Sequence, residues 1–146
     1  MKSFTVRLAN WQDDGPALRA IRETVFVHEQ HVSAELEWDE FDASCLHILA
    51  VDSAGNPIGT ARLLPDGHIG RMAVLREWRG RGVGSTLLQR LLAEAKKRHL
   101  RLAIVNAQTY AAGFYTRSGF RTEGEEFIDA GIPHVRMVLQ LPGSTD

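Results

Sequence analysis

The alternation of apolar and polar residues along this chain predicts a protein built mainly on strands. Short runs with a two-residue period or a continuous apolar stretch are separated by turn-forming residues rich in Gly, Pro, Asp and Asn, a pattern typical of strands. The runs predict strands at residues 4–8, 46–51, 58–64, 68–74, 102–105, 120–127 and 134–141, with a turn at 129–133 between the last two. Because short turns join the three strands between residues 46 and 74, we expect an antiparallel meander there.

Two segments instead carry the 3.6-residue period of amphipathic helices. In the first, Leu18, Ile21 and Val25 fall on one face, and the polar residues Asp13 and Asp14 before Pro16 are typical of a helix start. The second helix begins at Val83 and continues this spacing to residue 95, with polar residues on its other face. A shorter helix is expected near residues 111–117. The resulting order of strands and helices predicts an α/β domain.

The segment before the second helix carries the clearest chemical signal. It reads Arg-Gly-Arg-Gly-Val-Gly from Arg79 to Gly84, between an apolar strand and the helix start. Glycines let successive backbone amides converge, and the positive helix end and two guanidinium groups favour an anion. The absence of Lys after Gly84 excludes a P-loop, and the glycine spacing excludes the dinucleotide fingerprint. The segment therefore predicts a pyrophosphate site.

These residues resemble the GNAT superfamily of acyl-CoA-dependent N-acyltransferases. Arg79, Gly82 and Gly84 match the pyrophosphate loop of that family, and the runs 106–108 and 114–120 are similar to its next strand end and its short helix ending in Gly-Phe. The resemblance in element order covers residues 4–141. It implies an α/β (α+β) fold with a mixed, largely antiparallel central sheet of about seven strands flanked by helices. Residues 1–141 would form one domain, and residues 142–146 a frayed tail.

The resemblance also implies acetyl-CoA as the acyl donor, with no metal. The strand before the loop would pair with the pantetheine arm, and an amide near Ala73 or Val74 would stabilise the oxyanion of a tetrahedral intermediate. Asn106 would hydrogen-bond the pantetheine amide or surround the nucleophile, although a capping role is an equal alternative. The cofactor-binding residues expected on this basis are Met72, Ala73, Val74, Arg79, Gly80, Arg81, Gly82, Val83, Gly84, Asn106 and Tyr115.

The acid and the base of the reaction are less directly indicated. By resemblance, Tyr115 would protonate the leaving thiolate, with Tyr110 as the alternative. Many relatives place a glutamate on the strand before the loop, but this chain has Arg71 there. Glu29, at the end of the first helix, is the first substitute as general base, and His134 is the second. Both are also expected to contact the substrate.

Composition and charge narrow the functional classes. A formal net charge of −1 over 146 residues argues against nucleic acid as a partner, because nucleic-acid-binding proteins are usually basic. The single cysteine, Cys45, excludes an intramolecular disulfide and suits the cytoplasm, where we expect this protein. No apolar run is long enough to span a membrane, and His28 and His31 lack further ligands for a metal.

The sequence thus predicts an N-acetyltransferase that moves the acetyl group directly to a primary amine, without Cys45 as a carrier. The acceptor would be a small molecule or a protein amine, and the acidic stretch 35–42, expected beside the substrate channel, would favour a cationic one. A homodimer is left open. The alternative from a different class is a catalytically idle CoA-binding regulatory or interaction module on the same fold. A nucleic-acid binder using Arg76, Arg79 and Arg81 is disfavoured by the charge.

Overall fold

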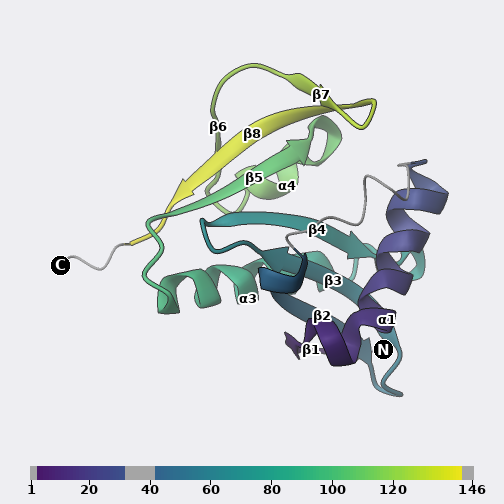
Figure 1. Cartoon of the computed structure of the whole chain (residues 1–146). Coiled ribbons are helices and arrows are strands. Elements are labelled where there is room, and N and C mark those ends of the chain that lie inside the picture. The colour runs from purple at the N-terminus through teal and green to yellow at the C-terminus, as the bar shows by residue number, and fades with distance from the viewer. Residues whose placement is uncertain (1–2, 32–41, 143–146) are drawn as a thin grey trace.

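A computed structural model describes residues 3–31 and 42–142 of the chain (Figure 1). Its strands and helices follow each other in one α/β order. The elements are β1 (Phe4–Ala9), α1 (Trp11–Arg22), η1 (Glu23–Glu29), η2 (Asp42–Ser44), β2 (Leu46–Asp52), β3 (Pro57–Leu63), β4 (His68–Val74), η3 (Arg76–Trp78), α3 (Val83–Lys97), β5 (Leu102–Gln108), η4 (Thr109–Ala111), α4 (Ala112–Thr116), β6 (Arg121–Thr122), β7 (Phe127–Asp129) and β8 (Ile132–Gln140). No helix within these described ranges is long and apolar enough to cross a membrane.

The strands form one mixed sheet, largely antiparallel, as predicted. Its order is β1-β2-β3-β4-β5-β8-β6, and β7 also pairs with β8. The described residues thus contribute eight strands, where the sequence predicted about seven. The meander of β2, β3 and β4 is confirmed, and the parallel pair is β4 with β5. That these two strands are parallel follows from the crossover through α3, since a parallel connection needs a long intervening segment.

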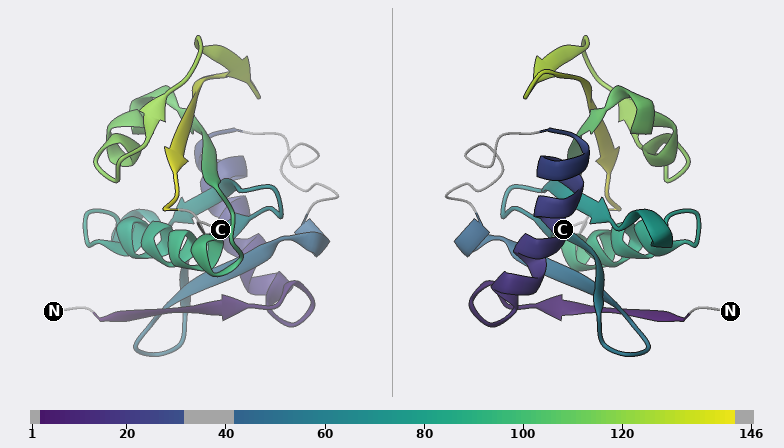
Figure 2. Two further views of the ribbon diagram at one scale, coloured as in Figure 1. Left: turned by 90° about the vertical axis from the view of Figure 1, so that its left-hand side faces the viewer. Right: turned by 90° about the vertical axis from the view of Figure 1, so that its right-hand side faces the viewer.

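The two long helices cover opposite faces of this sheet (Figure 2). On one face, α3 buries its apolar side, including Leu87, Leu88 and Leu91, against the main core. On the other face, Leu18, Ile21 and Val25 pack with Leu49 and Ala73, which confirms the apolar face predicted for the first helix. For the rest of the text, these are called the α3 face and the α1 face.

The first helix differs from its prediction at both ends. It begins at Trp11 rather than near Asp13, because the Asn10 side chain accepts hydrogen bonds from the backbone amides of Gln12 and Asp13. It then widens into the π-helical segment η1, in which the amide of Gln30 bonds to the carbonyl of Val25. Such wide turns often occur at functional sites.

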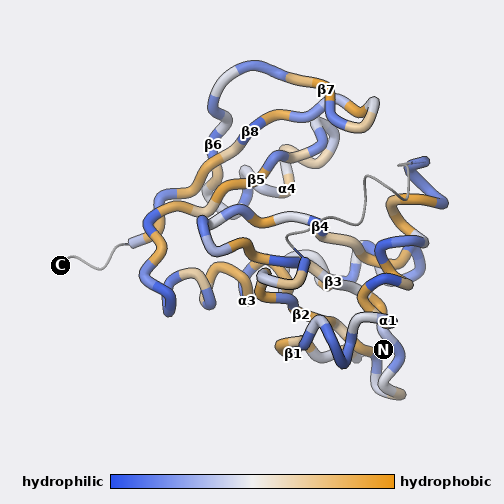
Figure 3. The backbone as a smooth tube through the Cα atoms, in the orientation of Figure 1, coloured by the Kyte–Doolittle hydropathy of each residue, from blue (hydrophilic) through white to orange (hydrophobic). Residues whose placement is uncertain are grey.

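The strand predicted over residues 120–127 is wrong as a single element. The structure has two short strands there, β6 and β7, which pair with different parts of β8. Between them, Gly124 has a φ of +84°, which interrupts extended backbone, and Figure 3 shows the polar character of this connection. The predicted turn at 129–133 shrinks to Ala130 and Gly131, because Asp129 already pairs with Ile132.

Two strands of the sheet separate where the site will be. Pairing between β4 and β5 stops at Ile69 and Val105, and Figure 1 shows the two strands diverging beyond this point. On its other side, β4 remains paired with β3 up to Val74, across a bulge in which Arg71 and Met72 both face Ala61. Arg71 has a φ of +49° at this bulge. From Gly70 to Val74, the edge of β4 on the β5 side is therefore free of strand pairing within the described residues.

A buried network of charged side chains lies on the α1 face. The carboxylate of Asp42 accepts hydrogen bonds from Arg22 at 2.7 and 3.2 Å and from Arg62 at 2.8 Å. His47 contacts the Asp42 carbonyl at 2.7 Å and stacks on Trp11. The predicted acidic loop from residue 35 lies outside the described residues, apart from Asp42 itself. Asp42 is buried rather than part of a solvated acidic surface.

Candidate active site

The divergence of β4 and β5 opens into a cavity of about 370 Å³. Its wall includes residues of η1, β3, β4, β5, η4, α4, β7 and β8. Successive strand residues point to opposite faces, and Val105 and Ala107 belong to the core on the α3 face. Asn106 and Gln108, which also line the cavity, therefore lie on the α1 face. The cavity is thus lined from both faces of the sheet.

The glycine loop lies on the path from β4 to α3, as the sequence predicted. Gly82 is the N-cap residue of α3 and has a φ of +87°. Because glycine has no side chain, this residue provides no side-chain cap for the first amides of the helix. A Cβ added at Gly80 or Gly82 would meet no atom within 4 Å, so space lies beside both. Amides of the first helical turn and open space together suit an anion. The fit to a pyrophosphate is therefore good.

Backbone carbonyl groups hold the side chains of the two loop arginines. Arg79 donates from Nε to the carbonyl of Val74 at 2.9 Å, and Arg81 donates from Nε to the carbonyl of Glu77 at 3.1 Å. The Arg81 guanidinium also lies over the Trp78 ring, 5.9 Å from its centre. These contacts fix both charged groups beside the start of α3.

The strand residues predicted to contact pantetheine line the open edge of β4. Ala73 is buried against the α1 face, whereas Met72 and Val74 are half-buried and pack against the main core. Met72 also lines the cavity. Asn106 lies across the gap on β5, is exposed, and lines the cavity as well. The structure thus brings the predicted pantetheine residues to the two sides of one gap.

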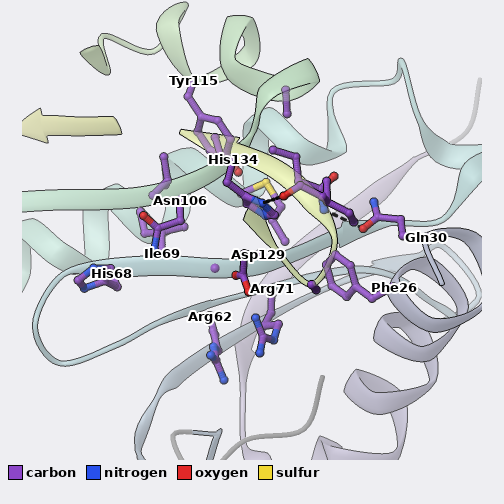
Figure 4. A pocket seen from close by; sticks show the side chains of 18 of the residues that line it. Phe26, Gln30, Arg62, His68, Ile69, Arg71, Asn106, Tyr115, Asp129 and His134 are labelled. Atoms are coloured by element: carbon purple, nitrogen blue, oxygen red, sulfur yellow. Dashed lines mark hydrogen bonds between the residues drawn. The ribbon is translucent and has the colours of Figure 1, made fainter. Parts of the chain in front are cut away.

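Tyr115 reaches the same cavity from α4 on the α3 face (Figure 4). Its ring contacts Phe114 and Phe120 edge-on, and α4 packs close to the start of α3 through Phe114 and Gly84. Burial raises the pKa of Tyr115 to about 12, with a smaller contribution from Tyr110. The phenol therefore keeps its proton at neutral pH. Tyr110, the alternative acid, also lines the cavity but is 76% exposed.

The structure does not bring Glu29 to the cavity wall. Its carboxylate pairs with Arg79 at 3.0 Å and with Arg76 at 3.6 Å, so it faces the glycine loop. The base and substrate roles predicted for Glu29 stay predictions, which this geometry does not favour. Its neighbour Gln30 does line the cavity and accepts a hydrogen bond from Gln108 at 2.8 Å. This contact joins the residue that follows η1 to the end of β5.

His134, the second candidate, is part of the cavity wall and is 8% exposed. Its Nδ1 lies 2.7 Å from the carbonyl of Ile132, and its ring stacks on Phe127. Sequence reasoning did not identify Asp129, Gln108 or Phe26, which also line the cavity. Gln108 closes the run 106–108 but was given no role, and Phe26 and Asp129 lie in no recognised motif, so only the pairing of distant segments places the three side chains there.

Within the described residues, no group of three or more His, Cys, Asp or Glu side chains is arranged to hold a metal ion. The site instead offers backbone amides, a phenol, an imidazole and amide side chains. This set suits polar recognition and proton transfer.

Comparisons with known proteins agree with this geometry. A family model described as an acetyltransferase (GNAT) domain matches residues 11–141. A Bacillus subtilis protein named as an uncharacterized N-acetyltransferase, YjcF, is 41% identical over 122 residues, which cover 81% of this chain and 86% of that protein. Among solved structures, an acyl-CoA N-acyltransferase from Pseudomonas aeruginosa has a TM-score of 0.80 at 28% identity, covering 94% of this chain and 99% of that one. Escherichia coli ElaA has a TM-score of 0.82 at 26% identity, covering 92% and 98%. The divergent strands, the glycine loop and these matches show that the chain belongs to the GNAT acetyltransferase family, whose reaction is acyl transfer.

Proposed function

We propose that this protein transfers an acetyl group from acetyl-CoA to a primary amine, by direct attack of the amine on the thioester. The observation that carries the proposal is the cavity at the divergence of β4 and β5, which is lined from both faces of the sheet. A thioester that enters from the α3 face and an amine that enters from the α1 face would meet in this gap. Direct transfer needs such a meeting point.

Acetyl-CoA would be held by two neighbouring parts of the structure, the glycine loop and the open edge of β4. The diphosphate would lie against the amides that follow Gly82, with Arg79 and Arg81 beside it. The pantetheine arm would pair with the open edge of β4 at residues 72–74, as an added strand does, and face Asn106. An amide of this strand would then stabilise the developing oxyanion.

Tyr115 would supply the proton for the leaving thiolate. Attack by the amine nitrogen forms the N–C bond, and collapse of the tetrahedral intermediate breaks the C–S bond. The sulfur takes a proton from the Tyr115 hydroxyl, which is protonated at neutral pH because its pKa is raised to about 12. The phenol then regains a proton from the nitrogen through water. A high pKa makes this group a weak acid but ensures its protonated form.

The ion pair of Glu29 with Arg79 supports a second candidate function, the catalytically idle CoA-binding module. Arg71 stands in the position of a carboxylate, and the carboxylate of Glu29 is paired with Arg79, so neither position offers an unpaired glutamate. Such a module would bind acetyl-CoA through the same loop and would not turn it over. The two candidates therefore differ in turnover and not in affinity.

The test is an acetylation assay with acetyl-CoA and a panel of primary amines containing a polyamine, an arylalkylamine, free amino acids and a lysine peptide. Thiol release is followed continuously, and mass spectrometry identifies the acetylated product. We expect an amide product from at least one amine. Binding of acetyl-CoA without any acetylated product would support the idle module, and failure to bind it would overturn both candidates.

A further inference from the structure

The β7–β8 hairpin presents one face to the cavity because of its short turn. The turn residues Ala130 and Gly131 have φ values of +53° and +77°, as a two-residue hairpin of the primed type requires. The register that follows pairs Phe127 with His134 and Asp129 with Ile132, so these four side chains share one face. Asp129, Ile132 and His134 line the cavity.

The hydrogen bond of His134 determines which ring nitrogen is basic. Its Nδ1 lies 2.7 Å from the carbonyl oxygen of Ile132, and a carbonyl oxygen can only accept. Nδ1 therefore carries the proton, and in the neutral ring Nε2 has the free lone pair. The stacking of the ring on Phe127, at 5.8 Å between centres, together with burial fixes the ring orientation. The ring of His134 is thus held in one orientation, with Nε2 as the nitrogen able to accept a proton.

Its location separates it from Tyr115. His134 pairs with Gln108 across β5 and β8, so it shares the α1 face with Gln108 and Asn106. Tyr115 packs with the core on the α3 face. Figure 4 shows both side chains directed into the same part of the cavity. The ionisable groups that share this cavity with His134 are Arg62, His68, Arg71, Tyr110, Tyr115 and Asp129.

We propose that His134 is the general base of the transfer, and that Asp129 draws the acceptor to it as an ammonium ion. This inference rests on the proposed function. Nε2 takes one proton from the ammonium group, and the neutral amine then attacks the thioester carbon. The imidazolium passes its proton to water after the transfer. Asp129 lies on the same hairpin face, is exposed, and provides a negative charge beside that position.

The same geometry indicates the acceptor class. An amine that arrives protonated, and is held by a carboxylate, is an aliphatic amine rather than an aromatic amine, which is neutral in water. Phe26 and Tyr110 line the cavity and suit an apolar portion next to the amine. We therefore expect aliphatic primary amines to be preferred over anilines.

The first experiment compares His134→Gln with the wild type, using the best amine of the panel above. We expect kcat/KM for the amine to fall by roughly 10²-fold or more. The pH profile of kcat/KM should differ from that of the wild type, because the variant must rely on amine that has already lost its proton in solution, and added imidazole should restore part of the rate. The Kd for acetyl-CoA and the Tm should change little. His99→Asn, at an exposed position with a φ of +60° at the end of α3, is the matched control and should behave like the wild type.

Asp129→Asn should raise KM for the amine several-fold and leave kcat nearly unchanged. Equal turnover of His134→Gln and the wild type would overturn the role of His134 while the proposed function stands. Inactivity of the wild type with every amine would instead overturn the proposed function. These two failures are therefore distinct.

A measurement on the wild type covers the case in which His134→Gln fails to fold. The ¹⁵N spectrum of the histidine side chains should show the neutral ring of His134 with its proton on Nδ1. Addition of the amine together with CoA should perturb the Nε2 signal. A proton on Nε2 in the neutral ring would overturn the proposal, because that nitrogen could not then accept one.

Discussion

Glu29 and Arg79 form an ion pair of 3.0 Å that joins the end of η1 to the first residue of the glycine loop. The two residues lie fifty positions apart in the sequence. Arg76 approaches the same carboxylate at 3.6 Å. A carboxylate therefore lies against the arginine that the pyrophosphate is expected to approach, and the two anions would compete for it.

This competition predicts the behaviour of Glu29→Gln. Because the pair is partly exposed, its interaction energy should be about 0.2–1 kcal/mol. Loss of the pair would leave Arg79 available to the pyrophosphate. We expect acetyl-CoA to bind roughly 1.5- to 5-fold more tightly by calorimetry, a range that corresponds to this energy. The value of kcat should stay within about threefold of the wild type. A fall in kcat of roughly 10²-fold, the effect expected from loss of a general base, would return the role of base to Glu29.

Gly82→Ala tests the pyrophosphate loop, and Gly55→Ala provides its matched control. Both glycines have a φ of +87°, and an added Cβ meets no atom within 4 Å at either position. The backbone strain should therefore be similar, about 1 kcal/mol. Gly82 precedes the amides that would hold the diphosphate, whereas Gly55 lies in the β2–β3 turn.

Thermal unfolding with acetyl-CoA separates the two variants. At a hundred times its Kd, a ligand stabilises the folded state by about 2.7 kcal/mol. For a chain of this length, that corresponds to a rise in Tm of roughly 5–10 °C. We expect this rise in the wild type and in Gly55→Ala, and a much smaller one in Gly82→Ala. Equal rises in all three proteins would remove the loop from the binding site.

Tyr115→Phe separates acid catalysis from cofactor binding. The phenyl ring keeps the contacts with Phe114 and Phe120, so the fold and the Kd for acetyl-CoA should be unchanged. Loss of the hydroxyl should lower kcat by roughly 10²-fold, the usual scale of general acid catalysis. Single-turnover kinetics at saturating acetyl-CoA measure this. Tyr110→Phe is the control, and if it rather than Tyr115→Phe lost activity, Tyr110 would be the acid.

Asp42→Asn should destabilise the fold strongly and make it less sensitive to acid. Burial raises the pKa of the Asp42 carboxyl, but the hydrogen bonds and charges of Arg22 and Arg62 outweigh burial, so the pKa lies below its usual value. Asp42 therefore adds stability above the ordinary aspartate pKa, near 3.9, and this stability is lost as the pH falls through the lowered pKa. Loss of one partner of a buried charge pair typically costs about 3–5 kcal/mol.

Urea unfolding at several pH values measures this effect. We expect a large loss of stability at neutral pH for Asp42→Asn, and a smaller dependence on pH below about pH 5 than in the wild type. Asp13→Asn is the surface control and should change the stability by no more than about 0.5 kcal/mol. A neutral result for Asp42→Asn would mean that the buried network does not stabilise the α1 face.

Much of the fold was predictable because it depends on local pattern. The turn residues between β2, β3 and β4 leave little choice but a meander, and the register of that meander confirms it. The glycine loop was visible because its amides, arginines and helix start are contiguous in sequence. Where a local pattern was ambiguous, prediction failed, as between residues 120 and 127, where apolar residues alone did not reveal the break at Gly124.

The sequence by itself determined the order of the elements, the apolar faces of the helices and the position of the glycine loop, because each arises from residues near each other in the chain. The tertiary structure decided which polar groups meet. The sequence could not show that Arg79 forms an ion pair with Glu29. Nor could it show that the His134 ring, which contacts the Ile132 carbonyl, lies at a cavity shared with Tyr115. The first contact joins separate elements. The second is local to β8, but only the pairing of β8 with β5 and β7 places it at the cavity wall. Hydrogen bonds and ion pairs act over a few ångströms, so their partners are known only after distant segments have packed together.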